Sequence, residues 1–313
     1  MPCQVPQRPP GGGRDNAPAG SAGAAWLRRQ KQQVRGRGTQ MSERQDRLGF
    51  IGAGNMATAL VKGLLQSETY REDQMLVSDP RPEALEAMRD LFGVVSLESN
   101  REVVKACGTV LLCVKPQQMG EVLEGISGAA GAEHLVISIA AGIPLKMIRR
   151  YLGEDVPLVR VMPNTPALVQ AGASALAPGP GTARHHLETA EKIFAAVGET
   201  VVVEEDKMDA VTALSGSGPG YVFRFMECMV AAGAAVGLEQ ETARRLVLQT
   251  FLGAAHLAKE SPDSLSRLRE NVTSPGGTTA AGLSVFEEMG LEKMIREAVA
   301  AACRRGEELG RRY

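Results

Sequence analysis

The sequence is short of the side chains from which nucleic-acid-binding surfaces are built. It has seven Phe, four Tyr and one Trp among 313 residues, and 35 Lys and Arg stand against 36 Asp and Glu. A nucleic-acid binder usually shows clustered basic residues together with aromatic side chains on which bases stack. Both are missing from the body of the chain, so we expect no nucleic-acid partner.

Cysteine is also scarce, and long apolar runs are lacking. The five cysteines are odd in number and widely spaced, and no two form a Cys-x-x-Cys pair. This spacing indicates neither a disulfide framework nor a zinc site, so we predict no metal and a reducing compartment. No run of about 18 apolar residues suggests a membrane span. The apolar stretch 221–237 contains Arg224 and Glu227, and we interpret it as a buried helix.

The near-zero net charge conceals a contrast between the two ends of the chain. The first 40 residues carry seven basic side chains and one acidic one, which gives +6 there and leaves −7 for residues 41–313. This segment is rich in Pro, Gly, Arg and Gln and cannot bury enough apolar surface to fold. We predict a disordered basic extension over residues 1–40. A transit peptide is the alternative, although Ser is scarce there and the Pro and Gly residues oppose a long amphipathic helix.

From residue 47 onward, short apolar runs alternate with helical patterns. Helices are predicted at 55–67, from about residue 81, and at 184–197. Strands are predicted at residues 47–54, 74–79, 109–116, 134–142, 156–164, 172–178 and 199–205. Strands that alternate with helices favour a parallel, doubly wound sheet. We therefore predict a dinucleotide-binding Rossmann domain over residues 41–205.

Beyond about residue 206 the strand signals stop. Long helical periods take over, at 218–237, 239–260, 263–271 and 290–311. A helix as uniformly apolar as 221–236 must be covered on all sides, and this half of the chain is too thin to do so alone. We predict an α/β fold in which a Rossmann-type doubly wound parallel sheet is followed by an all-α dimerisation and substrate domain over residues 206–313.

A glycine-rich turn follows the first predicted strand and opens a helix. Its sequence is Gly52-Ala53-Gly54-Asn55-Met56-Ala57, with Ala57 in place of the third glycine of G-x-G-x-x-G. In this strand–turn–helix context, backbone N–H groups and the helix dipole hold a pyrophosphate. We predict that Ile51 and the whole turn bind a dinucleotide cofactor.

The second predicted strand ends in Ser78-Asp79-Pro80-Arg81. An acid at this position accepts a hydrogen bond from the ribose 2′-OH and favours NAD, whereas a hydroxyl and an arginine suit the 2′-phosphate of NADP. We assign Ser78, Asp79 and Arg81 to the cofactor site. The choice between the two cofactors stays open, and Asp79 and Arg81 could equally form a solvated surface pair.

Two later turns stand where the nicotinamide half of a cofactor is expected, because ligands bind at the carboxyl edge of an open α/β sheet. They are Cys113-Val114-Lys115-Pro116 and Ala140-Ala141-Gly142. Lys115 either meets a phosphate or is an ordinary surface lysine. Asn100 either caps a helix or contacts the cofactor through its amide. We include all of these residues in the predicted cofactor site.

The sequence offers no obvious general base. A hydroxy-acid dehydrogenase needs one, commonly His or Lys. None of the histidines falls in a loop at the cofactor edge, and we interpret all four as surface or packing residues: His134, His185, His186 and His256.

A dense polar cluster, Asn271-Val272-Thr273-Ser274-Pro275-Gly276-Gly277-Thr278-Thr279, lies between two predicted helices. Hydroxyls and free N–H groups at a helix start can hold a carboxylate. Residues 215–220 form a second glycine- and serine-rich turn, and either segment could be a simple interhelical loop. A nicotinamide site, a carboxylate cradle and no general base suit reduction of a C=N bond, which accepts hydride without a strong acid.

Five segments together closely resemble the Δ1-pyrroline-5-carboxylate reductases. The order and spacing of the family hold from about residue 47 to 311, and SPGGTT is the most specific element. The segments are GFIGAGNMA at 49–57, CVKP at 113–116, RVMPNTP at 160–166, ALSGSGPGYVF at 213–223 and NVTSPGGTTAAGL at 271–283.

The resemblance implies reduction of the cyclic imine acid (S)-1-pyrroline-5-carboxylate to L-proline by NADPH, with NADH also accepted. It implies a helix-swapped dimer that assembles further into a decamer of five dimers. By position, the substrate site is Asn271, Ser274, Gly276, Gly277 and Thr279, with Thr279 as the catalytic residue near the imine nitrogen. Such sites combine helices of one chain with the Rossmann half of another.

The resemblance also implies a cytoplasmic location, which a working transit peptide in residues 1–40 would change to a mitochondrial one. One position departs from the family pattern, because Asp79 stands where relatives often have Ser. Two other functions stay open. One is a β-hydroxyacid dehydrogenase, for which Lys259 would have to serve as the base. The other is a cofactor-sensing scaffold without turnover.

Overall fold

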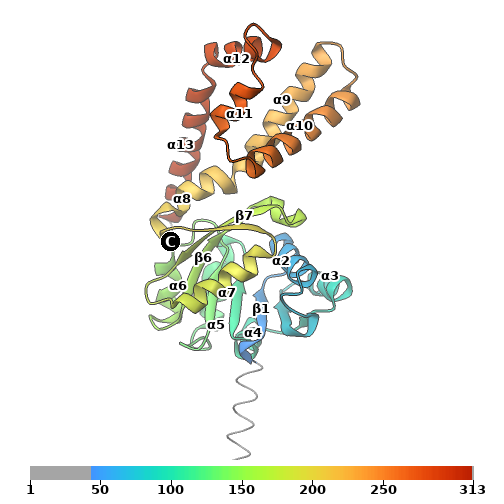
Figure 1. The fold of residues 1–313 in the computed structure, drawn as a ribbon. Helices are drawn as coiled ribbons and strands as arrows, with labels where there is room; N and C mark the ends of the chain where they lie inside the picture. The colour runs from blue at the N-terminus through green and yellow to red at the C-terminus, as the bar shows by residue number, and fades with distance from the viewer. Residues whose placement is uncertain (1–43, 312–313) are drawn as a thin grey trace, which may run out of the picture. The chain divides into compact units, whose positions relative to one another are not determined.

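The protein is described here by a computed structural model that covers residues 44–311. The predictions for residues 1–40, a disordered extension or a transit peptide, lie outside the described residues. The described residues from Gln45 onward form one compact unit. A single eight-stranded sheet, in the order β3-β2-β1-β4-β5-β6-β7-β8, occupies its first part (Figure 1).

The strands fall where the apolar runs predict them, but most are shorter. The predicted strands are longer because they include turn residues such as Gly, Pro and Lys at their ends, and these residues lie in the connecting loops. One very short strand, β3, was not assigned a range from sequence. The strands are β1 (Leu48–Ile51), β2 (Met75–Ser78), β3 (Val95–Ser96), β4 (Thr109–Leu112), β5 (Leu135–Ser138), β6 (Leu158–Met162), β7 (Gly172–Pro178) and β8 (Gly198–Val202).

The predicted doubly wound sheet is confirmed, and its strands are parallel with one exception. β7 runs antiparallel to β6, with Val161 paired to Leu176. The link between Met162 and Gly172 holds only the short 3₁₀ helix η3 (Thr165–Val169). A parallel return needs a crossover of a dozen or more residues. The chain therefore reverses direction here, while the full crossover through α7 makes β8 parallel to β7.

Six helices cover the two faces of the sheet (Figure 1). Helices α2, α3 and α7 pack on one face and α4, α5 and α6 on the other. Side chains alternate between the faces along β1, where Phe50 enters the first core and Ile51 the second. The helices are α2 (Asn55–Gln66), α3 (Pro82–Phe92), α4 (Asn100–Ala106), α5 (Met119–Ile126), α6 (Leu145–Leu152) and α7 (Arg184–Ala195).

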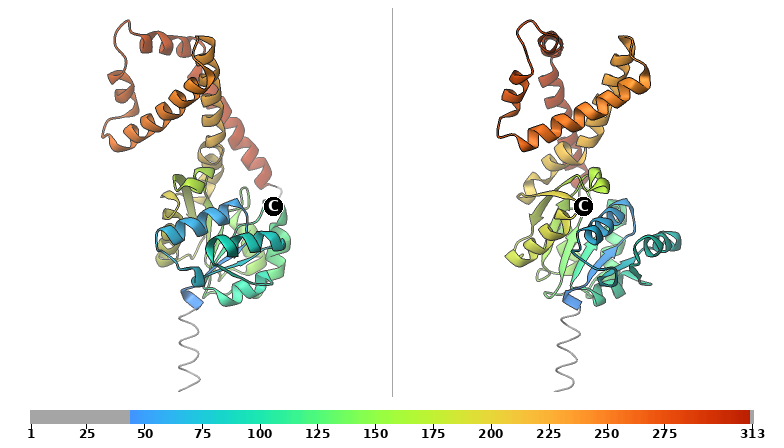
Figure 2. Two further views of the ribbon diagram at one scale, coloured as in Figure 1. Left: turned by 90° about the vertical axis from the view of Figure 1, so that its right-hand side faces the viewer. Right: turned by 45° about the vertical axis from the view of Figure 1, so that its right-hand side comes forward.

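After β8 the described chain contains helices and no further strand, as the sequence predicts. Here α13 returns to pack against α8 and a π-helical turn, η5 (Figure 2). Phe225 on α9 contacts Phe251 on α10 and Phe286 on α12, with ring centroids 6.1 and 6.2 Å away. The elements are α8 (Met208–Val211), η5 (Thr212–Gly216), α9 (Gly218–Ala235), α10 (Gln240–Glu260), α11 (Leu265–Asn271), α12 (Thr278–Glu288) and α13 (Leu291–Gly310).

The apolar helix α9 is not buried within one chain, which agrees with a helical half too thin to cover it alone; its burial by a second copy stays a prediction. None of its residues is buried, and Phe223 is 58% exposed. The reason is that the neighbouring helices of the same chain cover only part of its surface. Among the helices of residues 44–311, none is both long and apolar enough to cross a membrane.

Candidate active site

The glycine turn after β1 contains two glycines with different structural roles. Gly52 has a φ of 103°, and a Cβ on it would lie 2.6 Å from the carbonyl oxygen of Cys113. Its N–H donates to the carbonyl of Ser78 at 2.8 Å. No atom lies within 4 Å of the place where a Cβ of Gly54 would stand. Gly52 therefore lets the backbone turn, and Gly54 leaves open space above it.

A cavity of about 980 Å³ lies over this turn, at the carboxyl ends of β1, β2 and β4. Its volume is in the range of pockets that hold whole ligands. Twelve of the residues predicted to bind the cofactor line it: Ile51, Gly52, Gly54, Asn55, Met56, Ser78, Asp79, Arg81, Asn100, Cys113, Val114 and Lys115. The three turns were chosen separately along the sequence, and the fold gathers them around one space.

One wall of the cavity, formed by α5 and the turn before it, was not predicted from the sequence. Gln118, Glu121, Val122 and Gly125 line the cavity. Their spacing follows one face of a helix, and because α5 directly follows the predicted turn at 113–116, this signal could have found them. Pro80, Glu98 and Ser99 also contribute to the lining.

Some predicted cofactor residues do not line the cavity. Ala53 and Ala57 are buried beneath it, and Pro116 starts a short 3₁₀ helix, η2 (Pro116–Gln118). The turn 140–142 after β5 is absent from the lining. A Cβ on Gly142 would lie 3.7 Å from the Cβ of Leu309, at the end of α13. This turn therefore meets the helical half of the chain.

Asp79 and Arg81 form an ion pair at the rim of the cavity. The guanidinium Nε lies 2.9 Å from Oδ1 and Nη2 lies 3.0 Å from Oδ2. The N–H of Ala53 donates to Oδ2 at 2.8 Å. Burial alone would raise the pKa of Asp79, but the hydrogen bonds from Arg81 and from Ala53 outweigh it, so the pKa of Asp79 is lowered. The carboxylate stays ionised and is held against the glycine turn.

Asn100 faces the cavity and does not cap its helix. The N-cap of α4 is Ser99, whose Oγ accepts from the N–H of Glu102 at 3.2 Å, while the Glu102 carboxylate accepts from the N–H of Ser99. Asn100 Oδ1 accepts from the buried hydroxyl of Ser78 at 2.8 Å. Of the two roles left open for Asn100, the structure therefore rejects the N-cap.

Lys115 is exposed at the cavity rim, and Cys113 lies deeper. Burial raises the pKa of the Cys113 thiol, so this thiol stays neutral. The cavity thus has a carboxylate–guanidinium pair at its β2 end and a lysine at its β4 end. Arg81 and Lys115 can each pair with a phosphate group, and the lining also carries the carboxylates of Asp79, Glu98 and Glu121.

The polar cluster at 271–279 connects α11 to α12. Gly276 has a φ of 70°, and the N–H of Gly277 donates to the carbonyl of Ser274 at 2.9 Å. Thr279 stands in the first turn of α12 with an exposed side chain. No residue of this cluster lines the cavity over the glycine turn. Within one chain the two predicted halves of the active site are not brought together.

The second glycine- and serine-rich segment is helical. Residues 212–216 form η5, which the bond from the N–H of Ser217 to the carbonyl of Thr212 closes at 2.8 Å. The chain then enters α9 directly. The prediction of a turn at 215–220 is therefore wrong, because the extra residue of a π-turn accommodates these glycines within a nearly continuous helix.

None of the histidines lines the cavity. His134 is fully buried, with its Nε2 3.1 Å from the carbonyl of Val104, as expected of a packing residue. The Nζ of Lys259 lies 2.6 Å from Glu199 Oε1 on β8, and Lys259 is not in the lining either. Within residues 44–311, no group of three or more His, Cys, Asp or Glu side chains could hold a metal ion.

A nucleotide-sized cavity directly over a glycine turn, at the switch point of a doubly wound sheet, is typical of a dinucleotide-binding protein of the Rossmann type. The family model described as "Pyrroline-5-carboxylate reductase dimerisation" matches residues 205–309. The one described as "NADP oxidoreductase coenzyme F420-dependent" matches residues 47–142. The pyrroline-5-carboxylate reductase of Pseudomonas aeruginosa is 43% identical over 264 residues, which cover 84% of this chain and 96% of that protein. The chain belongs to the pyrroline-5-carboxylate reductase family.

Solved structures of the family agree with this fold. A pyrroline-5-carboxylate reductase from Coxiella burnetii superposes with a TM-score of 0.81 at 38% identity, covering 84% of this chain and 98% of that one. The Plasmodium falciparum enzyme, solved with NADP bound, gives 0.76 at 31% identity, covering 85% and 99%. The match therefore extends over both the sheet and the helical half.

Proposed function

We propose that this chain reduces (S)-1-pyrroline-5-carboxylate to L-proline with NADPH, and that it also accepts NADH. The observation that best supports a bound dinucleotide cofactor is the open cavity over the glycine turn. A Cβ on Gly54 would project into that space, so the glycine lets a pyrophosphate approach the backbone. The NADP bound to the Plasmodium falciparum relative supports the same assignment.

The proposed cofactor contacts run along the carboxyl edge of the sheet. Ser78, Asp79 and Arg81 bind the adenosine end of the cofactor. The turn at 51–57 binds the pyrophosphate, and Asn100 and Lys115 lie next to the pyrophosphate. The turns at 113–116 and 140–142 take the nicotinamide side. Support comes from the shared cavity lining for most of these residues and from the position of 140–142 after the next strand, β5.

The proposed substrate residues are Asn271, Ser274, Gly276, Gly277 and Thr279. When bound, NADPH would supply a hydride to the carbon of the protonated C=N bond, whose nitrogen would become the secondary amine of proline. This step needs no strong general acid or base, which agrees with a cavity lining without histidine. Free N–H groups at the start of α12 hold the substrate carboxylate, and the Thr279 hydroxyl bonds near the imine nitrogen.

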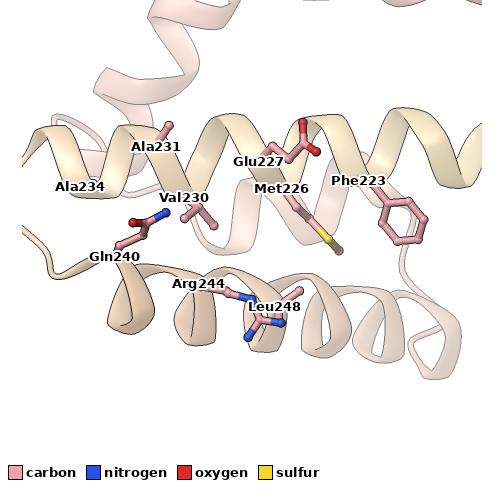
Figure 3. A pocket seen from close by; sticks show the side chains of 9 residues that line it. All are labelled: Phe223, Met226, Glu227, Val230, Ala231, Ala234, Gln240, Arg244 and Leu248. Atoms are coloured by element: carbon pink, nitrogen blue, oxygen red, sulfur yellow. The ribbon is translucent and has the colours of Figure 1, made fainter.

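We propose that each active site is completed by a second copy of the chain. Most of the large apolar side chains that are exposed belong to residues 214–309. An apolar groove lies between α9 and α10, and Phe223, Met226 and Leu248 are among the residues that line it (Figure 3). Exposed apolar surface of this extent is typical of protein interfaces. A symmetric dimer can bring the 271–279 cluster of one copy to the cavity of the other.

Three further assignments depend on family membership. We propose that residues 41–205 and 206–313 act as cofactor and dimerisation domains, and that five dimers form a decamer. Sedimentation velocity of the purified full-length chain would test the decamer, and a species of dimer size at all concentrations would contradict it. We also propose a cytoplasmic location, which fractionation of cells that express the full chain would test.

The activity is tested by following the oxidation of NADPH, and separately of NADH, in the presence of pyrroline-5-carboxylate. We expect turnover with both cofactors and formation of proline by mass spectrometry. Absence of turnover by protein that binds NADPH would contradict the proposed function and would favour the cofactor-sensing scaffold.

The substrate site is tested by Thr279→Ala, with Thr278→Ala as the matched control. Both residues are exposed in the first turn of α12. Loss of one positioned hydrogen bond is worth about 1.4 kcal/mol, so Thr279→Ala should lower kcat/KM by about tenfold or more. Thr278→Ala should change it much less. Equal effects of the two substitutions would remove Thr279 from the proposed site.

A further inference from the structure

Three residues on one face of β6 and its continuation contact the segment that joins the sheet to the helical half. Arg160, Met162 and Asn164 alternate along the strand direction, so they point to the same side. Arg160 pairs with Glu205 and Asp209. Met162 and Asn164 contact residues 215–216 of η5. We call these three residues the β6 clamp.

The first member of the β6 clamp is a buried cation. Arg160 is 7% exposed, and its guanidinium lies 3.5 Å from Glu205 Oε1 and 3.8 Å from Asp209 Oδ1. Glu205 Oε1 also accepts from the N–H of Leu145, at the start of α6, at 2.7 Å. Removing the cation would leave two neighbouring carboxylates without their counter-charge. The role of Arg160 is therefore structural: it neutralises Glu205 and Asp209 where the sheet joins the helical half.

Asn164 has a different environment, because it is only half-buried. Its Nδ2 donates to the carbonyl and to the hydroxyl of Ser215, at 3.3 Å each. Its Oδ1 accepts from the N–H of Ala173 on β7 at 2.8 Å. These bonds fix the direction of the amide: the NH₂ end faces η5 and the oxygen faces the sheet. Asn164 thus joins β6, β7 and η5 at one point.

The turn that Asn164 holds is a π-helix, which is rare and is frequent at functional sites. It fits tightly against β6, since a Cβ on Gly216 would lie 2.5 Å from Met162 Cε. Ser215 and Ser217 are half-buried, and the Ser215 hydroxyl accepts from Asn164 Nδ2. The β6 clamp therefore holds the Ser215 hydroxyl next to the carboxyl end of β6.

The strand order places this point beyond the nicotinamide side of the cavity. β2 carries the adenosine end and β1 the glycine turn, and the sheet continues through β4 and β5 to β6. A dinucleotide lies across the carboxyl ends of such a sheet, so its nicotinamide half extends toward β5 and β6. In the strand order, the cavity lining ends with the β4 turn, Cys113–Lys115, and the helix α5 that follows it. Asn164 and Ser215 stand further along the same edge.

We propose that Asn164 is a positioning residue for hydride transfer. Its amide holds Ser215 and η5 over the carboxyl end of β6, where they form the wall against which the nicotinamide ring is oriented. The inference rests on the proposed use of NADPH. It adds the pair Asn164 and Ser215 to the proposed site. Both residues lie outside the glycine turn and outside the polar cluster at 271–279.

The test compares Asn164→Asp with a control at the other end of β6. Asn164→Asp keeps the oxygen that accepts from Ala173 and replaces the NH₂ group with an oxygen that repels the carbonyl of Ser215. Thr182→Val is the control, because Thr182 Oγ1 donates to the carbonyl of Leu158 on β6 at 2.9 Å. It removes a comparable tie to the same strand, away from the carboxyl edge.

We expect Asn164→Asp to lower kcat about tenfold or more and to change the fluorescence of bound NADPH. Its affinity for 2′-phospho-ADP-ribose, which lacks the nicotinamide, should stay within about twofold of the parent chain. Thr182→Val should lower Tm and leave kcat and the fluorescence unchanged. Ser215→Ala should reproduce part of the effect of Asn164→Asp.

Unchanged kcat and fluorescence in Asn164→Asp would overturn the inference. So would an equal loss of affinity for 2′-phospho-ADP-ribose, because a general structural role would weaken both ends of the cofactor site. The fluorescence of bound NADPH needs no turnover. A parent chain that binds NADPH but does not reduce pyrroline-5-carboxylate would thus contradict the proposed reaction, while the fluorescence comparison would still decide the role of Asn164.

Discussion

The Arg81 guanidinium donates two hydrogen bonds to the carboxylate of Asp79, from Nε to Oδ1 at 2.9 Å and from Nη2 to Oδ2 at 3.0 Å. The N–H groups of Ala53 and of Arg81 itself donate to the same carboxylate, at 2.8 and 3.0 Å. These four donors fill the acceptor positions of a carboxylate. Asp79 is therefore not available to a ribose 2′-OH while the pair is closed. The Arg81 side chain is 56% exposed and can turn to a 2′-phosphate.

Arg81→Ala should therefore change the choice of cofactor. It removes the cation for a 2′-phosphate and leaves the charge of Asp79 to repel that phosphate, while it frees the carboxylate for the 2′-OH of NADH. A hydrogen bond to a charged group contributes about 1.5–3 kcal/mol, so NADPH should bind about tenfold or more weakly. NADH should bind at least as well as before. Fluorescence titration with each cofactor measures both affinities.

The matched control is Arg89→Ala, which removes an exposed arginine next to Asp90 on α3. Arg89 does not line the cavity, so neither affinity should change. Equal weakening of NADPH and NADH by Arg81→Ala would show that Arg81 does not discriminate between them.

The same pair should make stability depend on pH. The hydrogen bonds lower the pKa of Asp79 in the folded chain below its unfolded value of about 3.9. The unfolded chain then takes up the proton at a higher pH than the folded chain does. The stabilisation is present above the unfolded pKa and is lost as the pH falls through the folded pKa.

Asp79→Asn removes the titrating group. The difference in Tm between parent and variant should therefore shrink as the pH falls from about 5 to about 3. Thermal unfolding followed by circular dichroism measures this difference, and Asp90→Asn controls for the loss of one exposed carboxylate on α3. A Tm difference that stays constant with pH would mean that the ionised form of Asp79 contributes nothing specific.

The two glycines of the turn should separate folding from cofactor binding. Gly52→Ala puts a Cβ 2.6 Å from the backbone oxygen of Cys113 at a φ of 103°, and should lower the free energy of unfolding by about 2 kcal/mol or more. Gly54→Ala meets no atom within 4 Å and should keep stability within about 0.5 kcal/mol. Its methyl group should still weaken NADPH binding, because it enters the cavity.

Chemical denaturation and NADPH titration of both variants test this division. If Gly54→Ala bound NADPH as tightly as the parent chain, the pyrophosphate would not lie over the turn. A Gly52→Ala variant of unchanged stability would contradict the close approach to Cys113.

The apolar groove on α9 and α10 should be part of the interface between copies. Phe223→Glu places a charge on a groove residue that is 58% exposed in one chain, so it should shift the sedimentation profile toward smaller species. Leu91→Glu is the control, since Leu91 is 70% exposed on α3, outside the helical half. An unchanged assembly state of Phe223→Glu would exclude this groove from the interface.

Local patterns in the sequence were enough to predict seven of the eight strands, the glycine turn and most of the cavity lining. Each depends on residues close together in the chain: an apolar run for β4, Gly52 for a backbone turn that a Cβ would block. Two local signals were overlooked. The Ser99–Glu102 capping box identifies the cap of α4, and the short link before β7 excludes a parallel return.

The contacts of the turn after β5 could not be predicted in the same way. Gly142 carries the positive φ expected of a turn, but its neighbours Leu309 and Gly310 stand at the far end of the chain. Whether 140–142 also contacts the nicotinamide stays a prediction. A pattern within a few residues cannot report which distant helix packs against a loop.

The sequence by itself thus determined the doubly wound fold, the cofactor turn and the resemblance that led to the family. Only the tertiary structure decided that the N–H of Ala53 holds the Asp79 carboxylate from 26 positions away and that Met162 lies against η5. It also decided that Asn164 holds Ser215, 51 positions away. The reason is physical: apolar periodicity and glycine act on neighbouring residues, whereas the partner of a buried or half-buried polar group is chosen by the path of the whole chain.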